Sequence, residues 1–241
     1  MTIAELDPWP ITIATYNIHG AVGIDGKFSP ERIAQVIRQT GADVVALQEV
    51  PLGGGTGVNV LDYLRDRTGY IAAGGPTLKE PNGDFGNAVL SRYPVTAVRG
   101  IDLRFGAREP RGALDADLDF HGQPLRIVAT HLGLSLAERR HQIEVLLERF
   151  DTEEMAVVLL GDINEWFAWG HSLRRLREHF QNAPAPPTFP SIFPVLALDR
   201  LWIRPHQRLV QVRAHASPLA RRASDHLPLV ARIGSEVASS P

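Results

Sequence analysis

The 241-residue sequence contains no cysteine, which excludes disulfide bonds and thiolate metal sites. Any metal ion must therefore bind carboxylate, amide or imidazole side chains. No apolar run approaches the roughly 20 residues that a membrane-spanning helix needs. The N-terminus, MTIAELDPWP, lacks the basic start and apolar stretch of a secretory signal. We therefore expect a cytoplasmic protein with no transmembrane segment.

Long basic runs are also absent, and the net charge is -2. Proteins that bind duplex nucleic acid across many phosphates usually carry a basic face, so the charge argues against extended duplex binding. A basic groove confined to one face would not be visible in the net charge of the whole chain. Hydrophobic residues make up 44% of the chain, which is ordinary for a globular enzyme. No linker divides the sequence, so we expect one domain over residues 1–241, with its core at about 11–233.

Eight apolar segments are typical of β-strands. They cover residues 11–18, 43–50, 86–91, 113–120, 125–132, 155–163, 197–203 and 227–233. Residues 113–120 alternate between apolar and polar, which predicts one wet face, whereas the start of 155–163 is apolar throughout and predicts burial on both faces.

Helix signals lie between these strands. Ser29 and Pro30 predict a helix start and Gly41 its end. Ser135 and Glu138 form a capping box, which is followed by an apolar stripe at Ile143, Leu146, Leu147 and Phe150. Many strands with few helices favour a layered α/β or α+β fold in which two sheets pack face to face. The proline-rich residues 183–194 are predicted to form an ordered surface loop.

Polar side chains gather where the predicted strands end or begin, and ligand sites often form where strand ends converge. They are Asn17, Glu49, His131, Asp162, Asn164, Asp199, Asp225 and His226. Any one of them alone is more often a turn former or a hydrogen-bonded residue. Unpaired carboxylates beside apolar strands are costly, and a bound cation would relieve that cost. Oxygen ligands without cysteine favour Mg²⁺, with Mn²⁺ as an alternative.

The ordered motifs TYNIHG, LQEV, GNAVLSRYPV, THLG, GDINE, LDRLWI and SDHLPL resemble the endonuclease/exonuclease/phosphatase superfamily. This superfamily includes pancreatic-type deoxyribonucleases, abasic-site endonucleases, neutral sphingomyelinases and inositol-polyphosphate 5-phosphatases. The resemblance runs from about residue 11 to residue 233. It implies a four-layer α/β sandwich: two mixed β-sheets packed face to face, with helices outside.

The resemblance also implies a metal centre and a general base. Glu49 matches the metal-binding glutamate, Asn17 the asparagine beside it, and Asp225 an acid near the metal. Asp162 matches the acid that orients and deprotonates the attacking water. A base of this kind needs only reach and orientation toward one water, so we expect direct attack by water without a covalent intermediate.

Four further positions match residues that contact phosphate or support such a contact. Asn164 matches an amide that holds the phosphate, and His226 a donor to a phosphoryl oxygen. Asp199 matches the aspartate that orients this histidine, and His131 a phosphate contact near the leaving group. Donors placed in this way stabilise the charge that develops during in-line attack.

Several residues near these motifs have two open interpretations. Arg111 could bind a substrate phosphate or form a surface salt bridge, and Asn87 could bind substrate or His131 or have a structural role. Trp166 and Trp169 could form an exposed aromatic lip that contacts a base or a lipid surface, but packing beneath their loop is favoured.

The clustered arginines separate into two groups. Arg139–Arg140 and the cluster at 174–177 are expected on solvated helix faces. Arg221 and Arg222 precede Asp225 and could flank the cleft, where they would meet an anionic substrate.

The sequence departs from some branches of the superfamily. His19 stands where abasic-site enzymes usually carry an aspartate, and a tyrosine is expected near His131, which puts abasic-site cleavage in doubt. GNAVLSRYPV and SDHLPLVA resemble a compact bacterial branch that includes sphingomyelinase-like hydrolases.

Three functional hypotheses follow from these observations. The first is a metal-dependent phosphodiesterase or phosphatase on a small or lipid phosphate ester, with peripheral lipid contact. The second is a nuclease with the same centre and a nucleic-acid partner. The third is a non-catalytic binding protein that kept the fold. The intact set of catalytic residues argues against it, because a protein without catalytic activity is free to lose some of them.

Overall fold

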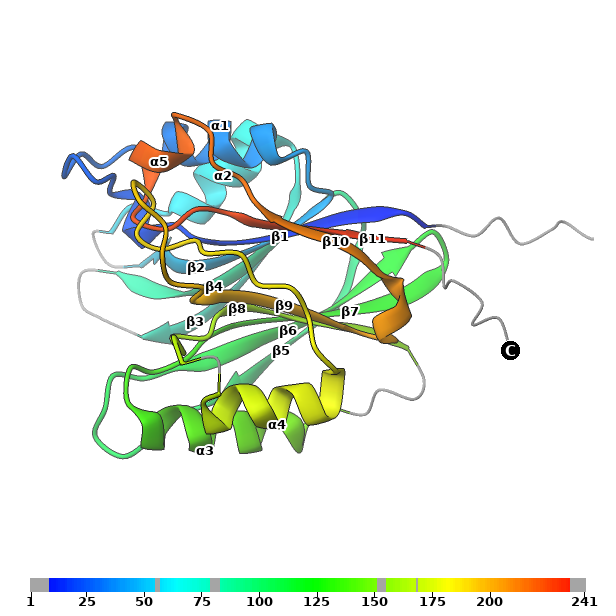
Figure 1. The fold of residues 1–241 in the computed structure, drawn as a ribbon. Helices are drawn as coiled ribbons and strands as arrows, with labels where there is room; N and C mark the ends of the chain where they lie inside the picture. Colours follow the sequence, from blue (N-terminus) through cyan, green and yellow to red (C-terminus); the bar gives the residue numbers. More distant parts are fainter. Residues whose placement is uncertain (1–8, 55–56, 79–82, 151–154, 168, 235–241) are drawn as a thin grey trace, which may run out of the picture.

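The computed structural model describes residues 9–54, 57–78, 83–150, 155–167 and 169–234. Figure 1 shows two β-sheets packed face to face, with helices covering both outer surfaces. The expected α/β sandwich of two mixed sheets is confirmed.

The larger sheet has six strands in the order β10-β11-β1-β2-β4-β3. Its members are β1 (Ile11–Asn17), β2 (Val44–Gly53), β3 (Ile71–Leu78), β4 (Asp84–Ser91), β10 (Leu209–Ala214) and β11 (Leu229–Ile233). β1 and β2 are parallel and the other pairs are antiparallel.

The smaller sheet has five strands in the order β5-β6-β7-β8-β9. Its members are β5 (Val95–Asp102), β6 (Gly112–Phe120), β7 (Gln123–His131), β8 (Ala156–Asp162) and β9 (Asp199–Arg204). Only β7 and β8 are parallel within it.

The helices form the outer layers. α1 (Pro30–Thr40), α2 (Val60–Thr68) and the short α5 (Ala220–Ala223) pack on the six-stranded sheet. α3 (Leu136–Leu147) and α4 (His171–Phe180) pack on the five-stranded sheet. Two 3-10 turns complete the described elements, η1 (His19–Ala21) and η2 (His206–Arg208). A third apolar core, which includes Ile13, Val44, Ile127 and Leu160, fills the space between the sheets.

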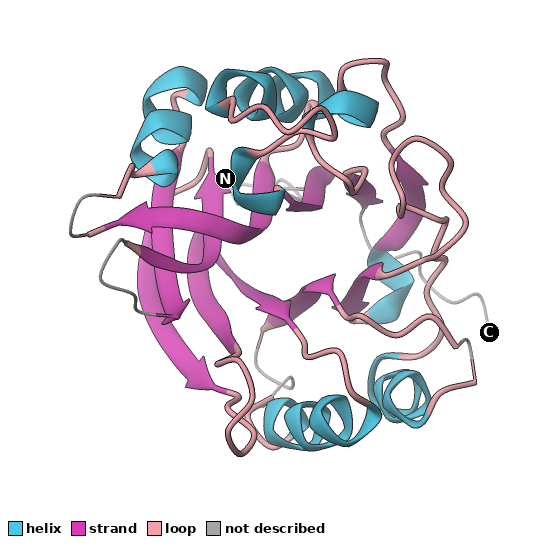
Figure 2. Cartoon of the chain, turned by 90° about the vertical axis from the view of Figure 1, so that its left-hand side faces the viewer, coloured by secondary structure: helices cyan, strands magenta, loops and turns pink. Residues whose placement is uncertain are grey.

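The register of the strands brings distant residues to one end of the sandwich. Asn17 at the end of β1 lies opposite Gln48 of β2. In the other sheet Asp162 pairs with His131 on one side and with Asp199 on the other. This end forms the left side of Figure 1 and faces the reader in Figure 2. The catalytic candidates therefore come from both sheets.

Three strands that the sequence did not indicate are β3, β5 and β10. All three lie at sheet edges, where one neighbour and much of the apolar burial are missing. β3 also contains Gly74, Gly75 and Pro76, which are depleted in strands.

The predicted start and end of α1 are confirmed: Ser29 is its N-cap, although its side chain makes no capping hydrogen bond, and Gly41 is its C-cap. One predicted detail of the strands is wrong. The alternating face of β6 is not simply wet, because Asp115 is buried and accepts hydrogen bonds from Arg99 and Arg126. Polar residues in a strand can thus indicate a buried ion pair rather than a solvent-exposed face. The continuous burial expected for β8 is confirmed, and residues 183–194 form a loop as predicted.

Candidate active site

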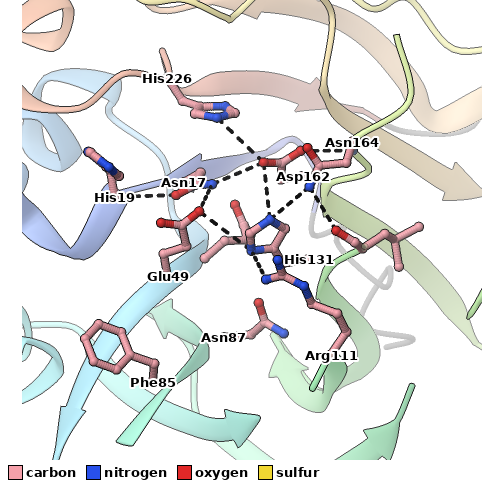
Figure 3. Close-up of polar contacts among 12 residues, drawn as sticks. Asn17, His19, Glu49, Phe85, Asn87, Arg111, His131, Asp162, Asn164 and His226 are labelled. Atoms are coloured by element: carbon pink, nitrogen blue, oxygen red, sulfur yellow. Dashed lines mark hydrogen bonds and ion pairs between the residues drawn. The ribbon is translucent and has the colours of Figure 1, made fainter. Parts of the chain in front are cut away.

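The candidate site lies where strand ends of the two sheets meet, and Figure 3 shows its polar side chains in contact. The groups come from the end of β1, the middle of β2, the ends of β7 and β8, the start of β9 and the turn before β11: Asn17, Glu49, His131, Asp162, Asp199 and His226.

Two site residues adopt a backbone conformation that is unusual for residues other than glycine. Glu49 has φ 54° at an irregularity in the pairing of β2 with β4, and Asn164 has φ 53° directly after β8. Such left-handed conformations cost on the order of 1 kcal/mol or more and persist only where the surroundings impose them. They occur here at two side chains that face the centre of the site.

Asn17 connects the two sheets. Its Nδ2 donates to Glu49 Oε1 at 2.9 Å and to Asp162 Oδ2 at 3.1 Å. Its Oδ1 accepts from the backbone N–H of His19 at 3.0 Å, which fixes the direction of the amide. One asparagine thereby sets the separation of the two carboxylates.

Asp162 is buried between two histidines. Its Oδ2 lies 3.6 Å from Nε2 of His131 and 3.6 Å from Nε2 of His226, and its Oδ1 accepts from the backbone N–H of Asn164 at 3.0 Å. Burial raises the pKa of this carboxyl, while the histidines and the Asn17 amide act in the opposite direction. A raised pKa suits a group that must accept a proton.

His226 is held as a cation. Burial lowers its pKa, but Asp199, with its Oδ2 at 2.8 Å from Nδ1, and the more distant Asp162 outweigh burial and raise the pKa to about 10. Thr188 Oγ1 donates to the same Asp199 oxygen at 2.5 Å. The Nε2–H of His226 consequently points toward the site as a charged donor.

His131 has the opposite charge state. Burial lowers its pKa to about 4, and the nearby Arg111 guanidinium acts in the same direction. Arg111 Nη1 lies 3.1 Å from Nδ1, and Asn164 Nδ2 lies 3.0 Å from Nε2. The two histidines beside Asp162 are therefore one neutral imidazole and one imidazolium at neutral pH.

A cavity of about 370 Å³ opens beside Glu49 and His131. Its wall includes Arg111, Asn87 and Phe85, the last on β4. It is large enough to hold a compact group attached to a phosphate at the centre.

The sequence matches a model of the endonuclease/exonuclease/phosphatase family over residues 14–226. The chain belongs to this family. Family membership supports a hydrolase of phosphate esters.

Two relatives illustrate how far the likeness extends. The uncharacterized protein YbhP of Escherichia coli (strain K12) is 32% identical, and the match covers 92% of this chain and 95% of YbhP. The crystal structure of an endonuclease/exonuclease/phosphatase from Beutenbergia cavernae superposes with a TM-score of 0.80 at 25% identity, covering 95% of this chain and 73% of that one.

A third comparison concerns the fold alone. The mannosyl-6-phosphatase Bt3783 of Bacteroides thetaiotaomicron superposes with a TM-score of 0.70 at 16% identity, covering 92% of this chain and 98% of that one. In the described part of our chain, no helix is both long enough and apolar enough to cross a membrane.

Two groups of residues could be considered for a divalent metal. Asp162, Asp199 and His226 offer ligand atoms within 4.8 Å of one another. We discount this group because Asp199 Oδ2 and His226 Nδ1 already bind each other at 2.8 Å, and Thr188 Oγ1 donates to the same carboxylate oxygen. Glu49 fits better, because its carboxylate is 35% exposed at the cavity and its Oε2 takes no hydrogen bond from the described residues.

Asp225 differs from the expectation that it lies with the metal group. In the described part of the chain its carboxylate contacts Ser224 Oγ at 3.3 Å and lies 3.9 Å from His19 Nδ1, and no contact with Glu49 or Asn17 occurs. The carboxylate therefore lies beside His19 of η1, and its place near a bound metal stays a prediction. The structure thus brings seven of the eight predicted strand-end residues together and leaves Asp225 at the margin.

Asn87 and Arg111 both line the cavity, but they differ in their partners. Asn87 is buried and donates to the carbonyl of Gly112 at 2.8 Å, so its contact is with β6 and not with His131. Arg111 reaches both His131 and Glu109, the latter at 3.3 Å, so it is more than a surface salt bridge.

The prediction that Arg139 lies on a solvated helix face is wrong. Its side chain is 1% exposed and pairs with the fully buried Glu165 at 3.2 Å. Arg139 Nη1 also donates to the carbonyls of Gly133 and Leu134. This ion pair links the segment after His131 to the segment after Asn164.

The packed position favoured for the two tryptophans is also wrong. Trp166 is 44% exposed and Trp169 is 80% exposed. Arg221, by contrast, does not flank a cleft as a free cation, because it donates to the carbonyls of Ser191 and Ile192.

Sequence reasoning missed several residues that support the site. Thr188 holds Asp199, and Ser224 Oγ donates to the carbonyl of Asn17 at 2.8 Å while accepting from the N–H of His226 at 3.2 Å. Gln142 of α3 accepts from the N–H of Gly133 at 2.8 Å. Only Ser224 had a sequence signal, through its place directly before Asp225–His226.

Proposed function

We propose that this chain is a divalent-metal-dependent phosphodiesterase that acts by direct attack of water on phosphorus. Residues 11–233 would form its one catalytic domain. The observation that carries the proposal is the position of Asp162, buried at the junction of the sheets between a neutral and a cationic histidine and joined through Asn17 to Glu49.

Glu49 and Asn17 are proposed to hold the metal, with Asp225 nearby. The donors are oxygen atoms, which favours Mg²⁺, with Mn²⁺ as an alternative. When bound, the ion would supply positive charge for the phosphoryl oxygens. Asn17 Oδ1 takes a backbone hydrogen bond, so Glu49 is the principal ligand in this proposal.

The protein side chains would divide the remaining work. Asp162 would orient a water and take its proton, since its raised pKa favours protonation as the water attacks. The His226 imidazolium would donate to a phosphoryl oxygen, held in place by Asp199. Asn164 would donate to the phosphate from the other side.

His131 and Arg111 would serve the leaving-group side. Both line the cavity with Glu49, and Arg111 Nη1 lies 3.1 Å from His131 Nδ1. Nδ1 of His131 faces the Arg111 guanidinium and Nε2 faces the Asn164 amide at 3.0 Å, so the neutral imidazole would hold these two donors in place beside a bound phosphate.

The favoured substrate is a small or lipid phosphodiester in a cytoplasmic setting, and a nuclease with the same centre is the alternative. The net charge of -2 argues against a duplex that is held over many phosphates. Exposed Trp166 and Trp169 beside the site fit a lipid. Plasmid nicking against hydrolysis of phosphatidylcholine vesicles separates these two substrates.

The test is hydrolysis of bis-p-nitrophenyl phosphate by purified protein with Mg²⁺, with Mn²⁺ and with EDTA. We expect turnover that EDTA abolishes and added metal restores. The paired control replaces Asp117, a partly exposed β6 carboxylate that pairs with Arg99 away from the site, by asparagine and should retain activity. Absence of metal-dependent turnover on any phosphate ester would refute the proposal.

A further inference from the structure

Exposed apolar side chains are unevenly distributed over the molecule. Among the described residues, fifteen large hydrophobic side chains are exposed, and eleven of them lie on segments that border the candidate site. We call these eleven the apolar rim: Ile24, Phe28, Phe85, Leu134, Leu136, Trp166, Phe167, Trp169, Ile192, Phe193 and Val195. Single exposed hydrophobic residues are ordinary, but their concentration around one opening requires an explanation.

Contacts to site residues fix two of these segments at the same end. The segment with Ile24 follows His19, whose N–H binds Asn17, and Ile24 N donates to the carbonyl of Arg222. The segment with Ile192 is held by Ser191, whose N–H donates to the carbonyl of Asp225. These two segments lie at the left end in Figure 1, which Figure 2 views directly.

The rest of the rim continues from the catalytic strands. Leu134 and Leu136 follow β7, and the aromatic segment starts at Trp166, two residues after Asn164. Phe85 lines the cavity beside Glu49 and His131. The rim therefore surrounds the opening through which a phosphate ester would enter.

The aromatic part of the rim adjoins an apolar hollow. The rings of Phe167 and Trp169 lie 5.8 Å apart, and those of Trp166 and Phe167 lie 5.9 Å apart. Phe167, Trp169 and Leu136 line a cavity of about 710 Å³ between the N-terminal ends of α3 and α4. Arg140, His141 and Glu144 also line this cavity, so only its apolar part suits the end of a hydrocarbon chain.

The charges near the rim do not form a basic face. Asp25 pairs with Arg32 at 2.9 Å and lies 3.6 Å from Arg222, while Glu109 pairs with Arg111. A nucleic-acid surface needs unpaired cations in register with phosphates. Leucine, isoleucine and valine side chains also do not stack on bases, whereas tryptophan and aliphatic groups together favour the interface of a lipid layer.

We infer that the apolar rim docks the enzyme on a zwitterionic phospholipid surface and delivers a lipid phosphodiester to the site. This inference rests on the proposed function for the chemistry that follows docking, but docking itself is independent of catalysis. Lys27 and Arg140 also lie near the rim, close to Asp25 and Glu144, so the charges there are of both signs. Since the rim itself is apolar, the association is driven by insertion of side chains and depends weakly on salt.

The experiment compares sedimentation with phosphatidylcholine vesicles for three proteins. They are the wild type, the rim variant Trp169→Ser/Phe193→Ser and the matched control Val98→Ser/Val210→Ser, which removes exposed apolar side chains from β5 and β10. We expect the wild type and the control to partition equally, and the rim variant to partition about tenfold or more weakly. Raising the salt concentration should change the wild-type value little.

Soluble and lipid substrates separate docking from chemistry. The rim variant should hydrolyse bis-p-nitrophenyl phosphate like the wild type but lose hydrolysis of vesicle lipid. Inactivity of the wild type on both substrates would refute the proposed function, while the sedimentation result would still decide docking. The inference is overturned if the wild type does not bind vesicles, if the control loses as much binding as the rim variant, or if duplex DNA is bound instead. It is also overturned if light scattering shows a wild-type dimer that the rim variant abolishes.

Discussion

The assignment of Asp162 as base predicts a loss of turnover without a loss of metal. Asp162→Asn keeps the shape and the hydrogen bond from Asn164 N–H but cannot take a proton. We expect the rate to fall about 10³-fold, the usual range for a positioned base. Mn²⁺ binding measured by calorimetry should stay near wild type, whereas Glu49→Gln should weaken it. Near-normal turnover in Asp162→Asn would show that another group activates the water.

A pH prediction follows from the Asp199–His226 pair. The folded pKa of His226, about 10, lies above the ordinary value of 6.5, so the folded state holds this proton more tightly than the unfolded state. Its contribution to stability is then complete below about pH 6.5 and is lost as pH rises through about 10.

Chemical denaturation at pH 6 and at pH 10 provides the measurement. His226→Gln removes the titrating group, so the wild type should lose more unfolding free energy than the variant between these two pH values. Equal losses in the two proteins would mean that the pKa of His226 is not raised by Asp199.

Individual residues show where sequence reasoning reached its limit. Asp162 and His226 could be predicted because each ends or precedes an apolar strand. Glu49 could be predicted because it lies near the end of the apolar segment 43–50, although β2 itself continues to Gly53. The position of Asp225 could not, because a single turn at Ser224 decides whether its side chain faces β2 or η1. Arg139 was misplaced because its burial depends on Glu165, a partner 26 residues away.

At the scale of elements, α3 acts as a support for the active-site loops. Its polar side chains Arg139 and Gln142 are buried and bind the backbone at Gly133 and Leu103, and Leu103 in turn binds the carbonyl of Arg111. A helix chosen for amphipathic packing alone would place apolar side chains there. The helix therefore connects the segments that carry His131, Asn164 and Arg111.

This supporting role predicts that the double variant Arg139→Met/Glu165→Leu has a much lower kcat than the wild type but only a small change in melting temperature. Replacing a buried ion pair by apolar groups is often neutral for folding, whereas removing one partner costs about 3–5 kcal/mol. A displacement of about 1 Å at the catalytic loops can cost about 100-fold in rate. We expect that loss in kcat, with a smaller effect on the melting temperature that comes from the backbone carbonyls of Gly133 and Leu134, which lose their donor.

The control for this experiment is Arg175→Met, which breaks an ion pair to Glu144 on the exposed side of the same helix. It should leave kcat unchanged. If the Arg139/Glu165 variant keeps wild-type kcat, the pair serves folding only.

Elements with strong burial were the ones that sequence could predict. The central strands β1, β2, β7 and β8 were found because continuous or periodic apolar letters reflect burial. The edge strands β3, β5 and β10 were not, since half of their surroundings is solvent and their sequences carry little periodicity. Asn17, His131 and Asp162 lie on central strands. Asp199 begins β9, an edge strand that was nevertheless predicted because its residues are almost all buried, so burial decides which strands the sequence indicates.

For the whole molecule, the two sheets contribute different parts of one centre. The six-stranded sheet provides Asn17, Glu49 and the turn with His226, and the five-stranded sheet provides His131 and Asp162. The apolar core between the sheets fixes their separation. Motif order could indicate this arrangement only through the family resemblance, because periodicity does not reveal which sheets face each other.

The whole-molecule claim is that this junction activates a water for attack on phosphorus. Hydrolysis of bis-p-nitrophenyl phosphate in ¹⁸O-labelled water, with Mg²⁺ or Mn²⁺, tests it most directly by mass spectrometry of the products. Attack of water at phosphorus predicts one ¹⁸O atom in the p-nitrophenyl phosphate that is released and none in the p-nitrophenol. Label in the p-nitrophenol, or no metal-dependent release of product, would contradict it.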